Sequence, residues 1–295
     1  MTPESNILSN GDLASLCFLL TAILFNIKRY IQTPRGAFLH KWGMRATGAL
    51  CFSFLHNILS DSPRPLWILF TTCILVFFLL ESIKIWHLTG LLTSMEIPLF
   101  PRFQSCDNKF VWPIGKFFDK QRTSILKEEF EQSTLLKVGN NGTACMFSPI
   151  FYSKDSKIRL QIMFDVFSTK RPFLNCILTS FLESGEAIIT TNMQTLFVSF
   201  YPKTWKIIRT STASLKNLIK LHRRQISEKT LTEFQRENTI ESLNTEQFNI
   251  ESENCRDGLC ERSNNSANTI MTFAGRYQLW CDMLSYSYLG TTIKH

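Results

Sequence analysis

The chain has 295 residues, of which 44% are hydrophobic, and a formal net charge of +8. That length is sufficient for one large or two small domains. The nine cysteines are scattered without the spacing of a disulfide framework, which argues against a disulfide-stapled secreted domain and favours a reducing compartment. The hydrophobic residues are concentrated near one end, because residues 13–27, 46–60 and 65–80 contain no Asp, Glu, Lys or Arg. This clustering is typical of membrane proteins.

The strongest membrane signal is the run over residues 65–86. Trp67 and Trp86 are 19 residues apart, which corresponds to about 28 Å along a helix and matches the spacing of two interfacial aromatic belts. Glu81 and Lys84, at i and i+3, are predicted to pair near the boundary, with the Lys84 stem reaching towards the head groups. The alternatives are a buried core helix, or a span with a functional charged site inside it.

Two earlier runs complete a predicted bundle of three transmembrane helices, over about 12–28, 45–60 and 65–86, within a membrane region at 1–95. The first charge-free run is short and needs the uncharged residues before it to cross about 30 Å of hydrocarbon. The second carries His56 and Asn57, and its alternative interpretation is a re-entrant or interfacial segment. The bilayer is therefore the first expected partner.

Charge predicts the orientation of this bundle. Residues 28–45 hold five bases and no acid, and residues 101–127 hold six bases against two acids. Basic segments stay on the cytoplasmic side. Three spans therefore predict a multi-pass protein of the cell (inner) membrane, with its N-terminus outside and its C-terminal part in the cytoplasm.

After the membrane region we expect a small antiparallel α+β domain over 96–225. It would begin with an extended connector at 96–122 and a short helix at 124–136. Strands are predicted over 144–152, 157–168, 195–201 and 205–210, with a hairpin over 173–192. A basic helix would close the domain at 212–224, burying Leu215, Leu218, Ile219 and His222.

The last part of the chain, 226–295, is predicted to combine an acidic segment with a C-terminal helix. Residues 227–261 hold nine acids against three bases. The stretch 249–268 is poor in hydrophobic residues and is predicted to be a loop. Apolar residues then recur at helical spacing, which predicts a helix packed through Ile270, Phe273, Ala274, Tyr277, Cys281 and Leu284.

No motif predicts a catalytic residue, a cofactor or a metal. The chain lacks G-x-G-x-x-G, G-x-x-x-x-G-K-[ST], G-x-S-x-G and H-E-x-x-H sequences. Cys255 and Cys260 form the only close cysteine pair, whereas a zinc site needs about four ligands. His222 with Asp165 or Cys145 could supply a base or a nucleophile, but nothing in the sequence brings them together.

The most informative polar feature is the stretch 202–224, which holds seven bases and no acid. Lys216, Lys220, Arg223 and Arg224 are candidate contacts for anionic lipid. The alternatives are a solvated face balanced by the acidic segment 227–261, and nucleic-acid binding, which the scarcity of aromatic residues disfavours.

These features predict a membrane-anchored interaction or regulatory module with an unidentified protein partner. The alternative is a membrane-embedded enzyme that acts on a lipid-like substrate through His222 or the Glu81–Lys84 pair.

Overall fold

The computed structural model describes residues 10–27, 34–60, 64–93, 100–106, 116–138, 146–164, 174–193, 200–210, 214–262 and 269–289. The chain divides into two compact units. We call residues 1–89 with 283–292 the helical unit, and residues 90–282 with 293–295 the sheet unit.

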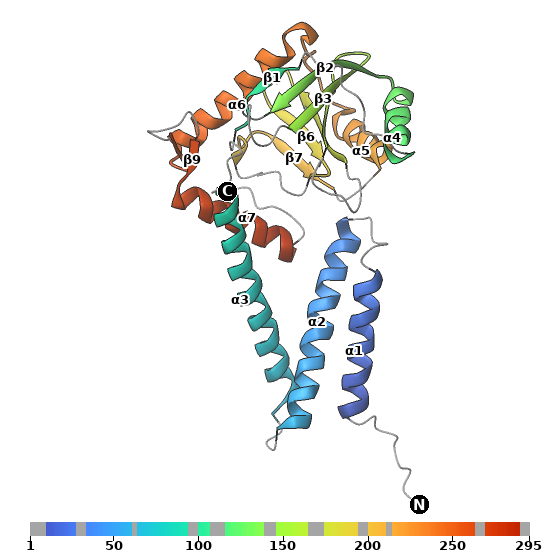
Figure 1. Cartoon of the computed structure of the whole chain (residues 1–295), viewed down its shortest axis with the longest axis vertical. Coiled ribbons are helices and arrows are strands. Elements are labelled where there is room, and N and C mark those ends of the chain that lie inside the picture. Colours follow the sequence, from blue (N-terminus) through green and yellow to red (C-terminus); the bar gives the residue numbers. More distant parts are fainter. Residues whose placement is uncertain are drawn as a thin grey trace, which may run out of the picture. The chain divides into compact units, whose positions relative to one another are not determined.

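Three helices, α1 (Asn10–Ile27), α2 (Pro34–Leu59) and α3 (Leu66–Thr93), form most of the helical unit (Figure 1). Helix α1 packs along α2. Helix α3 meets α2 through side chains: the rings of Phe52 and Phe77 have centroids 6.2 Å apart. The Phe77 ring also lies 3.5 Å from the place where a Cβ at Gly48 would be. A small residue at position 48 therefore leaves room for this ring.

The prediction of three transmembrane helices is wrong. Among the described residues, only α3 contains a stretch long and apolar enough to cross a membrane, Leu66–Leu91. The apolar part of α1, Gly11–Asn26, would cover only about 24 Å. Helix α2 has 26 residues, but Arg35, Lys41 and Arg45 occupy its first half. The fully charge-free remainder of α2 is too short for about 30 Å of hydrocarbon.

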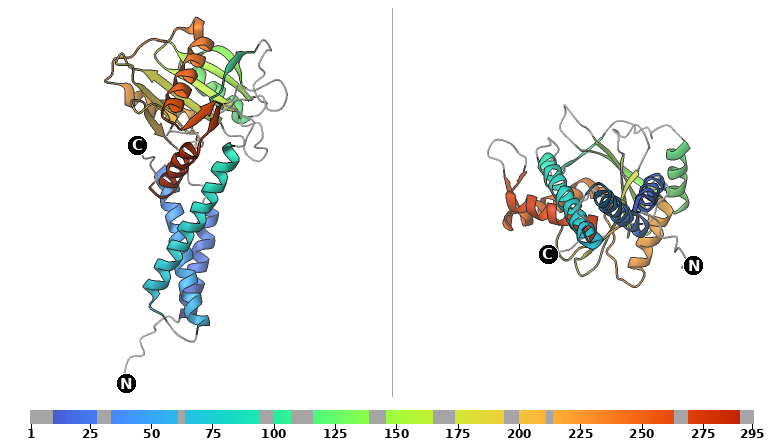
Figure 2. Two further views of the ribbon diagram at one scale, coloured as in Figure 1. Left: turned by 90° about the vertical axis from the view of Figure 1, so that its left-hand side faces the viewer. Right: turned by 90° about the horizontal axis from the view of Figure 1, so that it is seen from below.

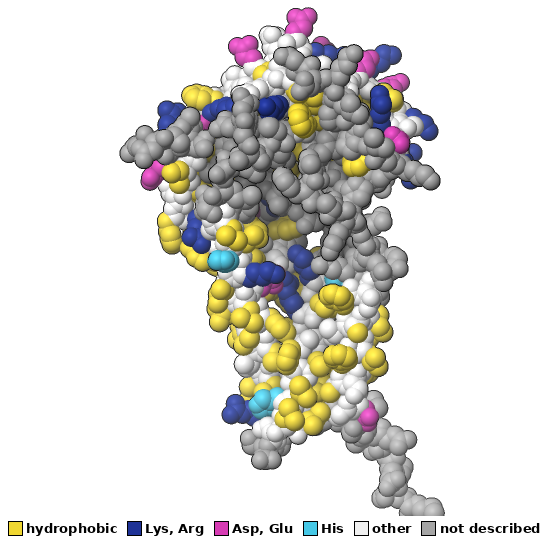
Figure 3. All heavy atoms as spheres, viewed as in Figure 1, with side chains coloured by type: hydrophobic (Ala, Val, Ile, Leu, Met, Phe, Trp, Pro, Cys, Tyr) yellow, Lys and Arg dark blue, Asp and Glu magenta, His cyan; other side chains and the backbone are white. Residues whose placement is uncertain are grey.

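Helix α3 is not the core helix of a soluble fold. Only 6% of its most apolar window is buried within the structure. Trp67 is 70% exposed, and large apolar side chains are exposed on several sides of the helix, including Leu75, Phe78, Leu79 and Ile83. Exposed apolar side chains also cover α1 and the second half of α2 (Figure 3). Such an extensive apolar surface marks contact with a membrane or a partner.

The sheet unit contains one sheet of seven strands in sequence order: β1 (Phe103–Ser105), β2 (Phe130–Val138), β3 (Met146–Ser153), β4 (Arg159–Phe164), β5 (Leu174–Phe181), β6 (Ala187–Thr191) and β7 (Lys206–Arg209). The strands from β1 to β6 are antiparallel, and β5 and β6 form the predicted hairpin. Strand β7 pairs parallel to β6. The small antiparallel sheet that we predicted is therefore a larger, mixed one.

Helices cover both faces of this sheet (Figures 1 and 2). On one face, α4 (Lys116–Lys127) and α5 (Leu215–Ile226) enclose the main core, which includes Ile125, Leu160, Leu178 and Leu218. On the other, α6 (Thr239–Arg256) packs Leu243 against Leu136, Ile150 and Tyr152. A bulge in β2 between Gln132 and Thr134 turns Phe130 and Leu136 to opposite faces.

Several predicted elements differ from the observed ones. The predicted helix 124–136 is wrong, because α4 ends at Lys127 and β2 begins at Phe130. Since α4 begins at Lys116, the predicted connector 96–122 is wrong in its last part. The predicted loop 249–268 is also wrong, since α6 continues to Arg256 and β8 (Cys260–Arg262) follows. Most of the predicted strand 195–201 lies outside the described residues.

The C-terminal helix exists as predicted, but the side of it that is buried differs from the predicted apolar face. Strand β9 (Thr269–Met271) pairs with β8 and leads into α7 (Phe273–Leu289). Phe273 and Tyr277 of the predicted apolar face are 74% and 53% exposed, whereas Leu279 is buried. Aromatic and apolar residues occur all around α7, so helical periodicity could not identify the packed side.

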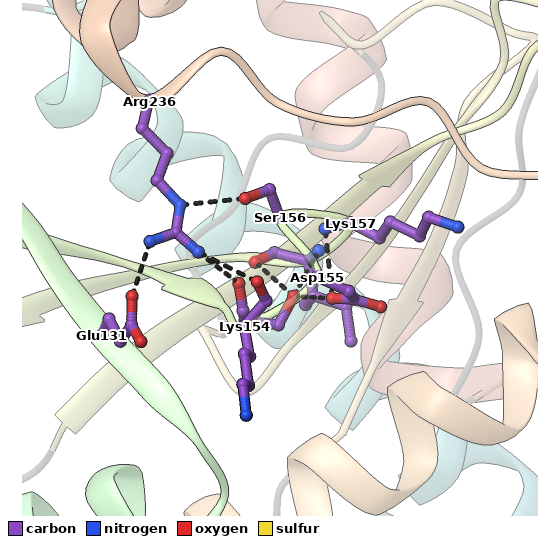
Figure 4. A network of polar contacts seen from close by, with 8 residues as sticks. Glu131, Lys154, Asp155, Ser156, Lys157 and Arg236 are labelled. Atoms are coloured by element: carbon purple, nitrogen blue, oxygen red, sulfur yellow. Dashed lines mark hydrogen bonds and ion pairs between the residues drawn. The ribbon is translucent and has the colours of Figure 1, made fainter.

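Arg236 fixes the segment between α5 and α6 to the turn after β3 (Figure 4). Its guanidinium group donates to the Ser156 hydroxyl at 2.9 Å, to the Glu131 carboxylate at 2.6 Å and to the Ser153 carbonyl at 2.9 Å. The Asp155 carboxylate accepts from the Ser153 hydroxyl at 2.5 Å. One arginine thus joins two strands and the connection to α6.

Candidate functional site

A partly buried ion pair connects α2 and α3 inside the helical unit. Arg45 donates to the Glu81 carboxylate at 2.6 Å, and their side chains are 11% and 30% exposed. An unpaired charge among apolar residues would be costly, whereas a close pair with further hydrogen bonds is stable. The pair therefore fixes α2 against α3 at this level.

The last turn of α7 completes this charged cluster. The Ser287 hydroxyl donates to Glu81 at 2.6 Å and accepts from Arg45 at 2.9 Å. The Arg45 guanidinium carbon lies 3.8 Å from the centroid of the Tyr288 ring, a cation–π contact. The Trp42 indole N–H donates to the Tyr288 carbonyl at 3.0 Å. We call Arg45, Glu81, Ser287 and Tyr288 the charged clamp.

The clamp replaces the predicted pairing of Glu81 with Lys84. Both oxygens of Glu81 already accept hydrogen bonds, from Arg45 and from Ser287. Lys84 is exposed and makes no ion pair with any described residue. Arg45 belongs to the basic segment 28–45, which we expected to be a loop, and 242 residues separate it from Ser287 along the chain. No local pattern could have shown this contact.

His222 lies in the core of the sheet unit and is 0% exposed. The Ser180 hydroxyl donates to the Lys157 carbonyl at 2.8 Å, so it accepts from the imidazole Nε2–H at 3.0 Å. Nδ1 then accepts from the Thr190 hydroxyl at 2.9 Å. Burial lowers the pKa of His222 to about 4, which keeps the ring neutral. This satisfied, enclosed histidine cannot reach a lipid-like substrate in this structure.

Helix α5 carries the predicted basic face. Ser214 caps its first turn by accepting from the Asn217 amide, and its opposite side buries Leu215, Leu218, Ile219, His222 and Ile226. Lys216, Lys220, Arg223 and Arg224 are all exposed. Arg223 donates to Glu128 at 2.7 Å. The other three make no ion pair with any residue that the structure describes.

The described ion pairs of the acidic segment 227–261 do not involve this face. Its described ion pairs lead elsewhere: Glu246 binds Arg159 in β4, and Glu251 binds Arg102. Two further acids, Glu253 and Asp257, contact Arg256 within the segment itself. In the described ranges, no ion pair connects the segment to the four bases of α5.

Helix α4 extends the basic face of α5. The two helices pack together, and each adds apolar residues to the same core. Their outward sides include six exposed bases besides Arg223, which are Lys120, Arg122, Lys127, Lys216, Lys220 and Arg224. We call these six and Arg223 the basic surface. The excess of bases over 101–127 was visible in the sequence. Because we predicted an extended connector at 96–122, we did not predict that some of these bases lie on a helix.

A shallow hollow lies beside α6. Its volume is about 570 Å³, and it is lined by Arg102, Ile240, Glu241, Asn244, Thr245 and Phe248. The side chain of Asn244 is hydrogen-bonded to the backbone of Phe103: it accepts from the N–H at 2.7 Å and donates to the carbonyl at 2.9 Å. Arg102 is paired with Glu251. Two of the polar side chains that line the hollow, those of Asn244 and Arg102, therefore already serve the fold.

No group of His, Cys, Asp or Glu residues suited to a metal occurs in the described part of the chain. Burial raises the pKa of the Cys260 thiol to about 12, so this thiol stays protonated and is a poor ligand or nucleophile. The two candidate partners of His222, Asp165 and Cys145, lie outside the described residues.

Comparison with known proteins does not identify the chain. No protein-family model, no curated protein and no solved structure matches it.

Proposed function

We propose that the chain is a membrane-anchored interaction module, held in the bilayer by α3. The observation that carries this proposal is the exposure of α3: its apolar stretch Leu66–Leu91 is long enough to span, and only 6% of the most apolar window is buried. Fully burying such side chains is worth about 1.5–3 kcal/mol each, and only a membrane or a large apolar partner provides that burial here.

The charged clamp supports this arrangement. Glu81 is 15 residues after Leu66, which places it about 22 Å along the helix and within two turns of Trp86. Charges at this depth are tolerated when they are paired and close to the interface. In this proposal the clamp attaches the end of α7 to α3. The chain is then held to the anchor both before and after the main part of the sheet unit, residues 90–282.

A spanning α3 has its two ends on opposite sides of the membrane. Within 20 residues before Leu66 the only Lys or Arg is Arg64, whereas Lys109 and Arg102 occur within 20 residues after Leu91. This difference and the bases of α4 favour a cytoplasmic location for the sheet unit. The interaction would then take place on the cytoplasmic side.

Alkaline carbonate extraction of membranes from cells expressing the full chain tests the anchor. We expect the protein to remain in the membrane pellet. A variant with Leu75→Arg and Leu79→Arg should be released, because each Arg costs about 2.5–3.5 kcal/mol at the centre of a span. A matched variant with two arginines at exposed polar positions of the sheet unit, Thr204→Arg and Asn217→Arg, should stay in the pellet. Release of the wild-type chain would refute the proposal.

A further inference from the structure

We infer that the basic surface of α4 and α5 binds the anionic head groups of the bilayer that holds α3. This inference rests on the proposed function and adds a partner to it. Helix α4 contains four bases and one acid, and α5 contains four bases and no acid. A helical surface with this excess of positive charge attracts phosphate-bearing surfaces.

The bases of this surface are available. Of the seven bases of the basic surface, only Arg223 forms an ion pair with a described residue, which is Glu128. Lys216, Lys220 and Arg224 point away from the buried side of α5, and the acidic segment 227–261 pairs with Arg102 and Arg159 instead. Six of the seven bases therefore form no ion pair with a described residue, which leaves them accessible to an external anion.

An exposed leucine favours lipid over nucleic acid. Leu126 is 62% exposed on α4, one turn after Arg122 and next to Lys127. An apolar side chain among bases suits the boundary between head groups and acyl chains. Single-stranded nucleic acid would need aromatic side chains for stacking, and no aromatic residue occurs among the residues of α4 and α5 whose side chains the structure describes as exposed.

The anchor keeps the surface near its partner. Helix α3 ends at Thr93 and α4 begins at Lys116, so even a fully extended connection spans at most about 83 Å. This short tether gives the lipid surface a high effective concentration, and weak individual contacts then suffice. Soluble polyanions receive no such advantage.

The test uses the full chain reconstituted in nanodiscs of phosphatidylcholine, with or without about 30% phosphatidylglycerol. Amine acetylation followed by mass spectrometry reports the accessibility of each lysine. We expect acetylation of Lys216 and Lys220 to fall at least threefold in the anionic discs, and to recover in about 0.5 M salt, where the Debye length is only about 4 Å. Lys154, on the turn after β3, serves as the internal control and should not change.

Charge reversal makes the test specific. In the variant Lys216→Glu/Lys220→Glu/Arg224→Glu, we expect Lys120 and Lys127 of α4 to lose their protection in the anionic discs. A matched variant reverses three exposed bases elsewhere, Lys154→Glu/Arg256→Glu/Arg262→Glu. It has the same net charge and should keep the protection of the α4 lysines.

Each other outcome overturns a defined statement. Equal acetylation in the two kinds of disc would refute lipid binding while leaving the anchor intact. Failure of the chain to enter either disc would refute the proposed function itself. Protection in neutral discs by inorganic phosphate or by a single-stranded oligonucleotide, equal to that in anionic discs, would assign the surface to a soluble anion or to nucleic acid and overturn the inference.

Discussion

Replacing Glu81 by alanine should release the last turn of α7 from the anchor. The substitution removes the acceptor of Arg45 and of the Ser287 hydroxyl, each 2.6 Å away. Leaving a buried charge without its partner costs about 3–5 kcal/mol. Glu81 is 30% exposed and Arg45 keeps a contact with the Ser287 carbonyl at 3.3 Å, so we expect the lower end, about 3 kcal/mol. That corresponds to an increase of about 10²-fold in the opening of this turn.

Hydrogen–deuterium exchange of the full chain in nanodiscs measures this opening. Amides of 284–289 should exchange about 10²-fold faster in Glu81→Ala, while those of α5 should not change. The matched control is Lys84→Ala, one turn further along the same helix, which should leave α7 unaffected. In the double variant with Arg45→Ala, the effect should be smaller than the sum of the two single ones, because the charge leaves with its partner.

Two results would refute the clamp. If Glu81→Ala left the exchange of 284–289 as slow as in the wild-type chain, the ion pair would not hold α7. If Lys84→Ala accelerated the exchange as much as Glu81→Ala, the originally predicted pairing of Glu81 with Lys84 would be the important one.

Three further predictions concern the sheet unit. Burial lowers the pKa of His222 to about 4, so the unfolded state binds a proton at this residue first as the pH falls below about 6.5. The free energy of unfolding should therefore drop by about 2 kcal/mol between pH 7 and pH 4.5 through His222. Glu246→Gln should cost about 3 kcal/mol, since Arg159, 4% exposed, donates to both Glu246 oxygens at 2.6 and 2.7 Å. Gly275→Ala should cost about 2 kcal/mol or more, because its Cβ would lie 2.1 Å from the Leu259 carbonyl oxygen.

Chemical unfolding monitored by circular dichroism checks all three, each against a matched variant. His222→Gln should lose about 2 kcal/mol of the pH dependence, and an unchanged pH profile would contradict the assigned cause. Glu241→Gln, on the exposed side of α6, should change the free energy of unfolding by less than about 0.5 kcal/mol, as should Ala274→Ser beside Gly275. If Glu246→Gln lowered the free energy of unfolding no more than Glu241→Gln, the Glu246 prediction would be refuted. The same comparison of Gly275→Ala with Ala274→Ser tests the Gly275 prediction.

The sequence alone showed much of the local structure. The charge-free run after Pro65 predicted α3, because a long apolar run can be recognised from consecutive residues alone. The alternation of apolar residues predicted β4, and the turn at Ser184–Gly185–Glu186 predicted the β5–β6 hairpin. Helix α5 also followed from its periodicity, including the burial of His222. These features depend on contacts between residues close in sequence.

The tertiary structure decided what long-range contacts determine. It paired Glu81 with Arg45 and Ser287 instead of Lys84, and it added the parallel strand β7 to the sheet. It also showed that the bases before β2 form a helix beside α5, whereas the sequence suggested a connector. Charge and hydropathy are properties of single residues and can be read in order, but the partner of a buried charge is selected by packing across the whole fold.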